Sequence, residues 1–483
     1  MATRLPDAEK RRQREGPNEE KSKPAMSLGS AHQKSGSTEL ALENRGEAPK
    51  AQSSGEARPA TRGNGGSGND GALMERVVER DNVKLALKRV RQNKGSPGVD
   101  GMTVDELPAW LNENYDELKK QLLNGTYEPR EVREQKIPKA GGGVRTLGIP
   151  TVIDRLIQQA MLNVLQPRFD PTFSESSYGF RPGRGAHDAV RAAQKYIQSG
   201  KSWGVDVDLE KFFDRVNHDV LMSRLEHRIS DKRMLGLIRR YLNADILADG
   251  VSVERHEGTP QGGPLSPLLA NVLLDEVDKE LEQRGHSFAR YADDCNVYVR
   301  SRRAGERVMA ALKVMYAGLH LRVNEAKSAV DYAWNRKFLG YRFWTAPGRT
   351  VKFRVAPESL EAMKQKVRQV TSRNGGRSLA KVVAELATYL TGWKNYFKLA
   401  TAGHRFRELD KWIRHRVRQV QVKQWKRGTT AYRELRSRGV DERNAREAAA
   451  NIRRWWAVSM LRGVEAALPA SEFDRLGIPR LYA

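Results

Sequence analysis

The feature that most restricts how this 483-residue chain can fold is a pair of acidic clusters, each set among apolar residues. The first cluster lies in residues 203–208, where apolar and polar side chains alternate. Successive side chains of a β-strand point to opposite faces of its sheet. The alternation therefore predicts a strand that carries Asp206 and Asp208 on one face and buries Val205 and Val207 on the other.

The second cluster is the adjacent pair Asp293 and Asp294, which stands between the apolar runs 288–291 and 295–299. Two such runs joined by a short polar segment predict a β-hairpin with the carboxylates at its turn. Adjacent carboxylates repel each other, so burying them costs stability unless cations bind there. Mg²⁺ prefers oxygen ligands, and two such ions about 4 Å apart activate an attacking oxygen and stabilise a leaving one. A solvated turn is the alternative for an isolated Asp-Asp pair.

Net charge indicates the class of partner. The chain has 85 Lys and Arg residues against 59 Asp and Glu, a formal net charge of +26. Each Lys or Arg that contacts a phosphate releases a counterion, which favours binding to nucleic acid of any sequence. We therefore expect a polyanionic partner, and nucleic acid is the first hypothesis.

Cysteine content and the lengths of the apolar runs exclude several classes of protein. The single cysteine, Cys295, excludes an internal disulfide framework and any zinc site built from paired thiolates. No apolar run reaches the roughly 20 residues that span a bilayer, and the N-terminus lacks the apolar core of a signal peptide. We expect a protein of the reducing cytoplasm, with no membrane and no disulfide partner.

Composition changes twice along the chain. Residues 1–72 contain no Phe, Trp, Tyr, Val, Ile or Cys, and such a segment cannot offset its ordering entropy, so we expect a disordered tail. A basic arm that binds nucleic acid is the alternative. Residues 356–483 hold 27 basic and 12 acidic residues, more than half of the net charge. An alternating stretch at 343–355 predicts strands and the helical spacing at 379–397 predicts a helix, so we place a domain boundary near residue 356.

A basic amphipathic segment lies between residues 404 and 427, where nine Lys or Arg residues stand against two acidic ones. Its apolar residues recur on one helical stripe and its basic residues on another. We expect the basic stripe to face outward and to follow an RNA backbone. The residues that we assign to RNA binding are Lys411, Arg414, Arg416 and Arg418. A solvated amphipathic helix is the alternative.

Eight motifs follow one another in a fixed order between residues 95 and 341. In chain order they are Gly95-Ser96-Pro97-Gly98-Val99-Asp100-Gly101, Ile137-Pro138-Lys139 with Arg145-Thr146-Leu147-Gly148-Ile149-Pro150-Thr151, Ser177-Tyr178-Gly179-Phe180-Arg181-Pro182, Asp208-Leu209-Glu210-Lys211-Phe212-Phe213-Asp214, Gly258-Thr259-Pro260-Gln261-Gly262-Gly263-Pro264-Leu265-Ser266-Pro267, Tyr291-Ala292-Asp293-Asp294, Asn324-Glu325-Ala326-Lys327 and Phe338-Leu339-Gly340-Tyr341. Together they resemble the group II intron-encoded reverse transcriptase and maturase family, and the resemblance covers nearly everything from residue 73 onward.

This resemblance implies an α/β (α+β) fold of the right-hand polymerase type. Residues 73–355 would form the fingers and a palm with an antiparallel sheet, and residues 356–430 an α-helical thumb and maturase (X) domain. Residues 431–483 would form a basic segment similar to a DNA-binding region. The implied activity is RNA-directed DNA synthesis for a mobile group II intron, with binding of the intron RNA and assistance in its splicing. The implied partners are the intron RNA, an RNA template with a DNA primer, and target DNA.

The resemblance also implies roles for the carboxylates. Asp208 and Asp293 match the aspartates that bridge two Mg²⁺ ions in a polymerase palm, and Asp294 matches a third carboxylate of that cluster. Phosphoryl transfer leaves little covalent work for the protein, so positioning and charge neutralisation supply most of the acceleration. We expect Asp206 to share the face of Asp208 and Asp214 to cap the helix that follows it.

Five further residues match positions that bind the incoming dNTP. Lys139 and Arg145 match basic residues that grip the triphosphate, where a guanidinium takes phosphate oxygens bidentately. Phe213 matches the ring that excludes a ribose 2′-hydroxyl, Gln261 matches a residue that lines the nucleotide pocket, and Lys327 matches a general acid for pyrophosphate. The alternatives are a solvated basic hairpin, a core aromatic residue and a surface lysine.

This sequence departs from the longer members of the family, which carry a C-terminal His-Asn-His endonuclease with paired cysteines. No cysteine follows Cys295, so we expect no second-strand nicking and a primer from another source. Two other hypotheses stay open: a maturase that only folds intron RNA, and a domesticated bacterial reverse transcriptase used in phage defence. Asp208, Asp293 and Asp294 argue against the first, and the maturase motifs argue against the second.

Overall fold

The computed structural model describes residues 72–138, 144–248, 251–372, 375–401 and 403–482. The tail expected at 1–72 lies outside the described residues, except for Ala72.

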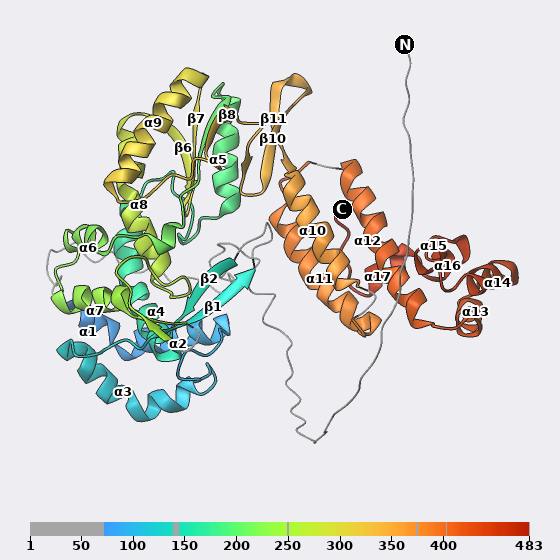
Figure 1. Ribbon diagram of the computed structural model, residues 1–483, viewed down its shortest axis with the longest axis horizontal. Coiled ribbons are helices and arrows are strands. Elements are labelled where there is room, and N and C mark those ends of the chain that lie inside the picture. Colours follow the sequence, from blue (N-terminus) through green and yellow to red (C-terminus); the bar gives the residue numbers. More distant parts are fainter. Residues whose placement is uncertain (1–71, 139–143, 249–250, 373–374, 402, 483) are drawn as a thin grey trace, which may run out of the picture. The chain divides into compact units, whose positions relative to one another are not determined.

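The first part of the described chain combines helices with a small sheet (Figure 1). Its elements are α1 (Leu73–Val77), α2 (Arg80–Asn93), α3 (Leu107–Asn124), β1 (Val132–Pro138), β2 (Val144–Ile149), α4 (Val152–Phe169) and η2 (Asp170–Thr172). β1 and β2 pair antiparallel, and α4 begins at a cap in which the Thr151 side chain accepts a hydrogen bond from the amide of Asp154. Most of α4 is buried, and it packs against α1 and α2 before it and against α8 (Ser266–Gln283) after it.

The four-stranded palm sheet has the strand order β6-β7-β3-β8, with antiparallel neighbours throughout. Its strands are β3 (Trp203–Val207), β6 (Ser287–Tyr291), β7 (Asp294–Val299) and β8 (Ala329–Tyr332). The strand expected at 203–208 and the hairpin expected at 288–299 are therefore confirmed.

Two helices cover opposite faces of the palm sheet (Figure 1), α5 (Ala186–Gln198) and α9 (Arg302–Gly318). Val205 and Val207 are fully buried in the same apolar cluster as Leu312 of α9. The other face, which carries Asp206 and Asp208, is the side of α5. The expected separation of carboxylates from valines on this strand is confirmed.

The segment between β3 and β6 holds η3 (Phe212–Asp214), α6 (His218–Glu226), α7 (Lys232–Asn243), β4 (Ile246–Ala248), β5 (Val251–Val253) and α8 (Ser266–Gln283). β4 pairs parallel with β1, so the sheet of the first part has the order β2-β1-β4-β5. The helix α6 is capped by the side chain of Asn217, which accepts a hydrogen bond from the amide of Val220. The expectation that Asp214 caps this helix is therefore wrong, because Asp214 ends the preceding 3₁₀ turn three residues earlier.

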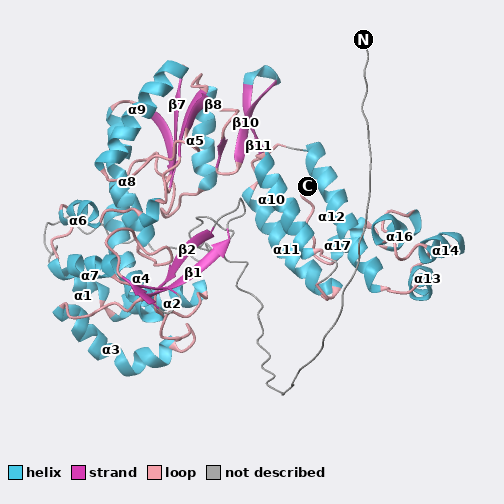
Figure 2. Cartoon of the chain, viewed as in Figure 1, coloured by secondary structure: helices cyan, strands magenta, loops and turns pink. Residues whose placement is uncertain are grey.

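A three-stranded sheet of β9 (Lys337–Phe338), β10 (Tyr341–Ala346) and β11 (Thr350–Val355) follows, with η4 (Pro347–Arg349) between the last two strands. The described residues after β11 form helices and loops only (Figure 2). These helices are α10 (Pro357–Val370), α11 (Leu379–Tyr396), α12 (Gly403–Gln424), α13 (Gly428–Ser437), α14 (Glu442–Ala450), α15 (Trp455–Val458), α16 (Arg462–Ala467) and α17 (Ala470–Arg475). The strands expected at 343–355 and the helix expected at 379–397 are confirmed.

No helix in the described ranges is both long and apolar enough to cross a membrane. The buried Cys295 carries a free thiol on β7.

Candidate functional site

The register of the palm sheet brings the two acidic clusters to one end of the sheet. The last recorded pair between β3 and β7 is Val207 with Cys295, so the next position sets Asp208 beside Asp294. Tyr291 pairs with Asp294 across the β6–β7 hairpin, which leaves Ala292 and Asp293 as a two-residue turn. The hairpin therefore carries Asp293 to the same end of the sheet as Asp208.

The turn that contains Asp293 has a constrained backbone. Ala292 has φ of 58°, a left-handed conformation that residues other than glycine adopt at a cost. Gly179 packs directly on this turn, because a Cβ atom at residue 179 would lie 2.2 Å from the amide nitrogen of Ala292. The neighbouring amide of Tyr178 donates to the carbonyl of Arg290 at 2.9 Å. The glycine in the Ser-Tyr-Gly-Phe motif thus allows a close approach that no other residue permits.

Asp208 contacts the motif that follows β7 and α9. The ammonium of Lys327 lies 3.5 Å from Asp208 Oδ1, and about a third of the Asp208 side chain (34%) is exposed. The amide of Asp208 donates to Ser328 Oγ at 3.0 Å, and its carbonyl accepts from the amide of Asn324 at 2.8 Å. The Asn-Glu-Ala-Lys motif is therefore anchored on Asp208, and Lys327 is brought to the carboxylates.

The carboxylate of Asp206 forms an ion pair with a different cation, Arg336. Arg336 donates from Nε and Nη2 to Asp206 Oδ2 at 3.0 and 2.7 Å, and from Nη2 to the carbonyl of Lys327 at 2.6 Å. Burial raises the pKa of Asp206, and the ion pair with Arg336 opposes this rise only in part. Arg336 consequently joins the strand to the loop of Lys327, and Asp206 has a structural role beside Asp208.

Phe213 and Gln261 lie on two segments that bond to each other. The amide of Thr259 donates to the carbonyl of Phe213 at 2.7 Å, and Gln261 Nε2 lies 3.5 Å from Asp214 Oδ1. The ring of Phe213 is half-buried, with its centroid 6.5 Å from that of Phe180. The fold therefore brings the aromatic candidate and the glutamine candidate together.

The loop of Gln261 also bonds to the first sheet. The amide of Gly148 in β2 donates to the carbonyl of Gln261 at 3.1 Å. A Cβ atom at Gly262, whose φ is 148°, would lie 2.4 Å from the carbonyl oxygen of Gly148. These two glycine-containing motifs meet backbone to backbone, which explains why they contain glycine.

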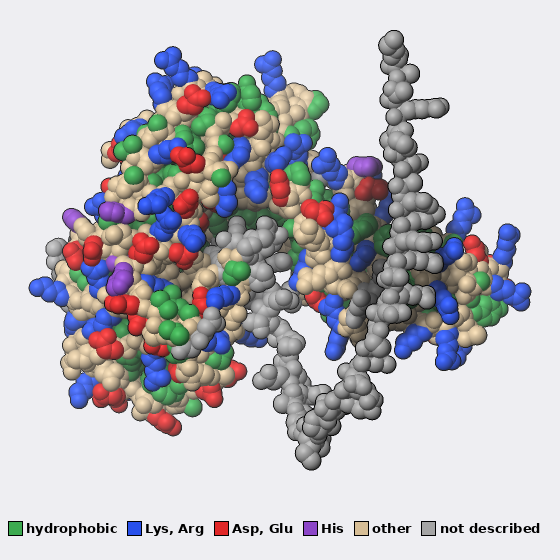
Figure 3. All heavy atoms as spheres, in the orientation of Figure 1, with side chains coloured by type: hydrophobic (Ala, Val, Ile, Leu, Met, Phe, Trp, Pro, Cys, Tyr) green, Lys and Arg blue, Asp and Glu red, His purple; other side chains and the backbone are tan. Residues whose placement is uncertain are grey.

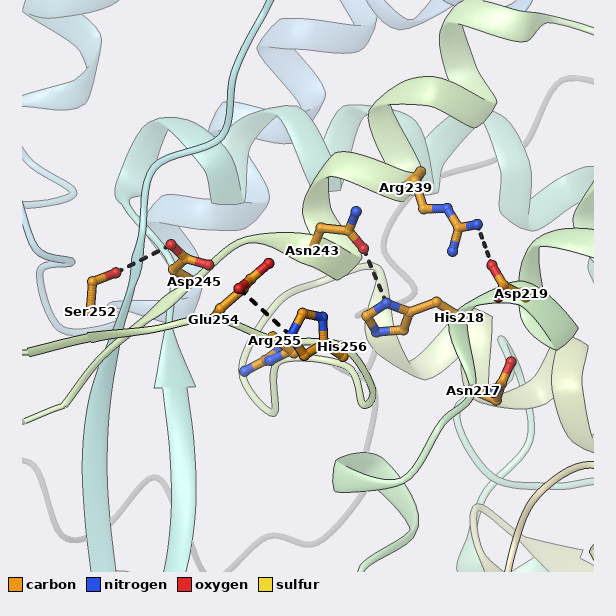
Figure 4. A pocket seen from close by; sticks show the side chains of 10 residues that line it. All are labelled: Asn217, His218, Asp219, Arg239, Asn243, Asp245, Ser252, Glu254, Arg255 and His256. Atoms are coloured by element: carbon orange, nitrogen blue, oxygen red, sulfur yellow. Dashed lines mark hydrogen bonds and ion pairs between the residues drawn. The ribbon is translucent and has the colours of Figure 1, made fainter.

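A polar cavity of about 430 Å³ is lined in part by Glu254, Arg255 and His256, which precede the same loop in the chain (Figure 4). Its wall holds the ion pair of Arg239 with Asp219 and a contact of His256 Nε2 with a carboxylate oxygen of Glu254 at 3.6 Å. His218 Nε2 lies 2.7 Å from the carbonyl oxygen of Gly258, at the start of the Gln261 motif. The cavity thus belongs to the support of that loop.

The carboxylates can be tested for their fit to Mg²⁺. No three His, Cys, Asp or Glu side chains in the described part of the chain converge closely enough to hold a metal ion alone. Mg²⁺ does not require such a cage, because it is usually held by one or two carboxylates plus substrate phosphates and keeps several waters. Asp208, Asp293 and Asp294 supply oxygen donors at one end of the sheet, and Lys327 already places a cation there. The donor set therefore fits Mg²⁺.

Two dNTP-binding candidates lie partly or wholly outside the described residues. Lys139 falls in the gap at 139–143, and only the backbone of Arg145 is described, in β2 opposite Ile137. Their roles stay predictions.

The basic helix α12 differs from the expectation. Its apolar stripe is buried as expected, with Ile413 and Val417 fully buried. Arg414 is only 3% exposed, and it donates to Asp410 at 3.2 Å and to Asp474 of α17. Arg418 is 8% exposed and donates to the carbonyl of Leu468 and to Glu465, both at 2.8 Å.

The expectation that Arg414 and Arg418 face outward is therefore wrong. A second layer of helices supplies carboxylates that pair with both guanidinium groups inside the protein. Arg416 is half-buried and donates to Thr371 Oγ1 at 2.9 Å. Lys411 is exposed and pairs with Glu408 at 3.2 Å, so among the four RNA-binding candidates it alone projects into solvent.

Comparison with known families identifies both halves of the chain. Residues 137–343 match the family described as reverse transcriptase (RNA-dependent DNA polymerase), and residues 360–439 match the group II intron, maturase-specific domain. Protein YkfC of Escherichia coli K12 is 32% identical over 325 residues, which cover 59% of this chain and 85% of that protein. This chain belongs to the group II intron reverse transcriptase and maturase family.

Other proteins are similar to shorter parts of this chain. The group II intron-encoded protein LtrA of Lactococcus lactis subsp. cremoris is 35% identical over 219 residues, which cover 45% of this chain and 36% of LtrA. The chain thus spans about a third of LtrA. A solved structure, the partial Cas6-RT-Cas1–Cas2 complex, matches 51% of this chain and 42% of that chain at 26% identity with a TM-score of 0.34. All three carboxylate candidates lie within the reverse transcriptase match, and α12 lies within the maturase match.

Sequence reasoning missed several residues that hold the site of this reverse transcriptase together. Ser328 and Arg336 bind the backbone of Asp208 and the side chain of Asp206, and Arg290 is fully buried directly before the Tyr-Ala-Asp-Asp motif. The sequence of α8 could have predicted a buried partner such as Arg290. Asn271 and Asp278 are polar residues, seven positions apart, on the buried face of this apolar helix. Polar residues on such a face require partners inside the protein.

Proposed function

We propose that this reverse transcriptase extends a DNA primer on an RNA template at the palm carboxylates, with dNTPs as substrates. One observation carries the proposal: the palm register and the two-residue turn bring Asp293 and Asp294 to the end of the sheet where Asp208 lies beside Lys327. Asp208 and Asp293, with Asp294 as a third carboxylate, would hold two Mg²⁺ ions. When bound, such ions neutralise phosphate charge and promote loss of the proton from the attacking 3′-hydroxyl.

The residues around the carboxylates have separate tasks. Lys327 Nζ lies 3.5 Å from Asp208 Oδ1, and this side chain would serve as the general acid for the leaving pyrophosphate. The half-buried ring of Phe213 would exclude a 2′-hydroxyl from the sugar site, and Gln261 would line the same pocket. Lys139 and Arg145, at the β1–β2 hairpin, would bind the triphosphate.

We propose that intron RNA binds a different surface of α12 from the one that the sequence pattern suggested. A groove of about 580 Å³ runs between α10 and α12. Its lining combines the apolar side chains of Leu360, Leu409 and Trp412 with the cationic Lys364, Arg368, His404 and Arg405, and with Glu408. Lys411 lies beside the groove through its ion pair with Glu408.

The chemistry of this groove suits single-stranded RNA. Unstacked bases bind apolar and aromatic surfaces, while Lys and Arg bind the phosphates. Arg368 lies over the ring of Trp412 at 5.8 Å and pairs with Glu361 at 2.7 Å, so its charge stabilises the wall of the groove. Lys364, Arg405 and Lys411 are the cations that we assign to RNA phosphates, in place of Arg414, Arg416 and Arg418.

The last segment, 431–483, is our candidate for target DNA. Arg side chains project from the helices around α13, α14 and α16 on the face seen in Figure 3. The exposed Trp456, with its centroid 3.7 Å from that of His415, adds an aromatic surface near Arg453 and Arg454. In a bacterium, copying and splicing of intron RNA would take place in the cytoplasm.

Two variants test the roles of the palm carboxylates and of the RNA-binding groove independently. Asp293→Asn keeps the shape of the side chain but removes a charge that binds metal, so we expect single-turnover extension to fall by roughly a thousandfold or more. Its Kd for intron RNA should stay within twofold of wild type.

The triple change of Lys364, Arg405 and Lys411 to Gln should weaken intron RNA binding, lower the slope of log Kd against log salt by about two to three, and impair splicing.

The triple variant should extend a saturating, annealed primer and template within about threefold of wild type. Its matched control replaces three exposed lysines on α2 and α3, Lys88, Lys119 and Lys120, by Gln. Full extension by Asp293→Asn would overturn the assignment of the carboxylates. Equal losses of RNA affinity in the triple variant and its control would overturn the assignment of the groove.

A further inference from the structure

A fully buried arginine lies directly before the motif that carries Asp293. Arg290, at the end of β6, is 0% exposed, and so is its ion-pair partner Asp278 on α8. Its Nε donates to both oxygens of Asp278 at 2.7 and 2.9 Å, and its Nη2 also donates to Ser177 Oγ at 2.8 Å. Its Nη1 donates to Asn271 Oδ1 at 3.0 Å and to the carbonyl oxygen of Ala292 at 2.9 Å. Every polar atom of the guanidinium is therefore bonded.

The hydrogen bond from Arg290 to Ala292 holds the backbone of the β6–β7 turn, which consists of Ala292 and Asp293. Ala292 is the residue with φ of 58°, and Asp293 follows it. Gly179 presses on the amide side of Ala292, and Arg290 holds the carbonyl side. Asn271 closes the network, because its Nδ2 donates to the carbonyl of Gly179 at 2.9 Å. The turn is thus held from both sides by groups that bond to each other.

Stability alone does not account for this network. A buried ion pair loses much of its attraction to the cost of removing both charges from water, and apolar residues of similar size are often as stabilising. Burial opposes the charge on Arg290, but Asp278 outweighs it and raises the pKa of the guanidinium, so Arg290 stays charged. An apolar side chain could fill the space of Arg290, but it could not hold a carbonyl oxygen in place.

We propose that Arg290 is a positioning residue: by binding the carbonyl of Ala292 it fixes the turn that orients the Asp293 carboxylate toward Asp208. The inference rests on the proposed role of Asp293 in copying. Misplacement of a catalytic group by about 1 Å costs roughly a hundredfold in rate, so a loosened turn should lower kcat even in a folded protein.

The test compares two buried arginines in the full-length protein. Arg290→Met combined with Asp278→Leu removes the pair without leaving an unpaired buried charge. The control is Arg418→Met combined with Glu465→Gln. Arg418 is 8% exposed and donates to Glu465 and to the carbonyl of Leu468, both outside the palm sheet and its hairpin. Thermal unfolding by circular dichroism confirms that each variant is folded.

We expect the Arg290 double variant to lose about a hundredfold in kcat, with its Kd for annealed primer and template within twofold of wild type. Hydrogen exchange of amides 291–295 should become faster in this variant and stay unchanged in the control. The control should keep kcat within about threefold. If the double variant does not fold, Arg290→Lys replaces it in the test. The lysine ammonium can still pair with Asp278 but cannot reach all the acceptors of the guanidinium. We expect the same loss of kcat and the same faster exchange.

A folded Arg290 variant with unchanged exchange at 291–295 would overturn the proposal, and so would an equal loss of kcat in the control. The exchange measurement does not depend on catalysis. If Asp293→Asn extends primers normally while the Arg290 variant shows faster exchange at the turn, the assignment of Asp293 fails but the structural role of Arg290 stands.

Discussion

At the scale of single residues, strand geometry sets the face of each palm aspartate, and distant segments supply the side chains that bind it. Alternation with buried valines placed Asp206 and Asp208 on one face, because strand geometry leaves no other arrangement. The side chains that fix these aspartates come from distant segments: Ser328 binds Asp208, and Arg336 binds Asp206. Local sequence patterns do not predict such partners, because these residues are distant in the chain and come close only in the folded protein.

Phe213 gives a prediction at this scale. If its ring closes the sugar site, Phe213→Ala should lower the preference for dNTP over the matching ribonucleotide by at least about tenfold, with a smaller effect on dNTP use. The measurement is kcat/KM for each nucleotide on the same template. The matched control is Phe212→Leu, because Phe212 is 3% exposed in the core and should affect stability but not discrimination. An unchanged preference for dNTP over ribonucleotide in a folded Phe213→Ala protein would show that Phe213 only packs in the core.

At the scale of elements, the amphipathic pattern of α12 located a helix but assigned the wrong environment to its basic stripe. The pattern cannot tell whether a polar stripe meets water or a second layer of protein. Here Asp474 of α17 and Glu465 of α16 pair with Arg414 and Arg418. Gly179 and Gly262 stand where two backbones touch and a Cβ atom has no room.

The helix α6 gives a prediction about pH. Burial lowers the pKa of His218, whose Nε2 contacts the carbonyl of Gly258. The folded protein therefore favours the neutral imidazole, and the unfolded chain binds more protons below pH about 6.5. This contribution to stability is complete above that pH and is lost as the pH falls through it. We expect the difference in melting temperature between wild type and His218→Gln to shrink between pH 7.5 and pH 5.5, and a constant difference would contradict this role.

At the scale of the whole molecule, the order of motifs predicted the fold class, and the family comparison confirmed it. The domain boundaries stay predictions. β11 ends at Val355 and α10 begins at Pro357, as the boundary near 356 requires. However, buried residues of α5, before this point, share one apolar cluster with α11 and α12 after it. Sequence composition marks where chemistry changes along the chain, whereas packing decides which segments share a core.

The central claim is that one chain both copies RNA and assists splicing. The most direct measurement compares, on one preparation of wild-type protein, the rate of primer extension on an RNA template with the rate of intron splicing at low Mg²⁺. We predict that both rates rise well above those of protein-free controls, and that Asp293→Asn loses extension while keeping splicing. Splicing without extension by the wild-type protein would contradict the account and indicate a splicing cofactor. Extension without splicing would also contradict it and indicate a reverse transcriptase with another cellular task.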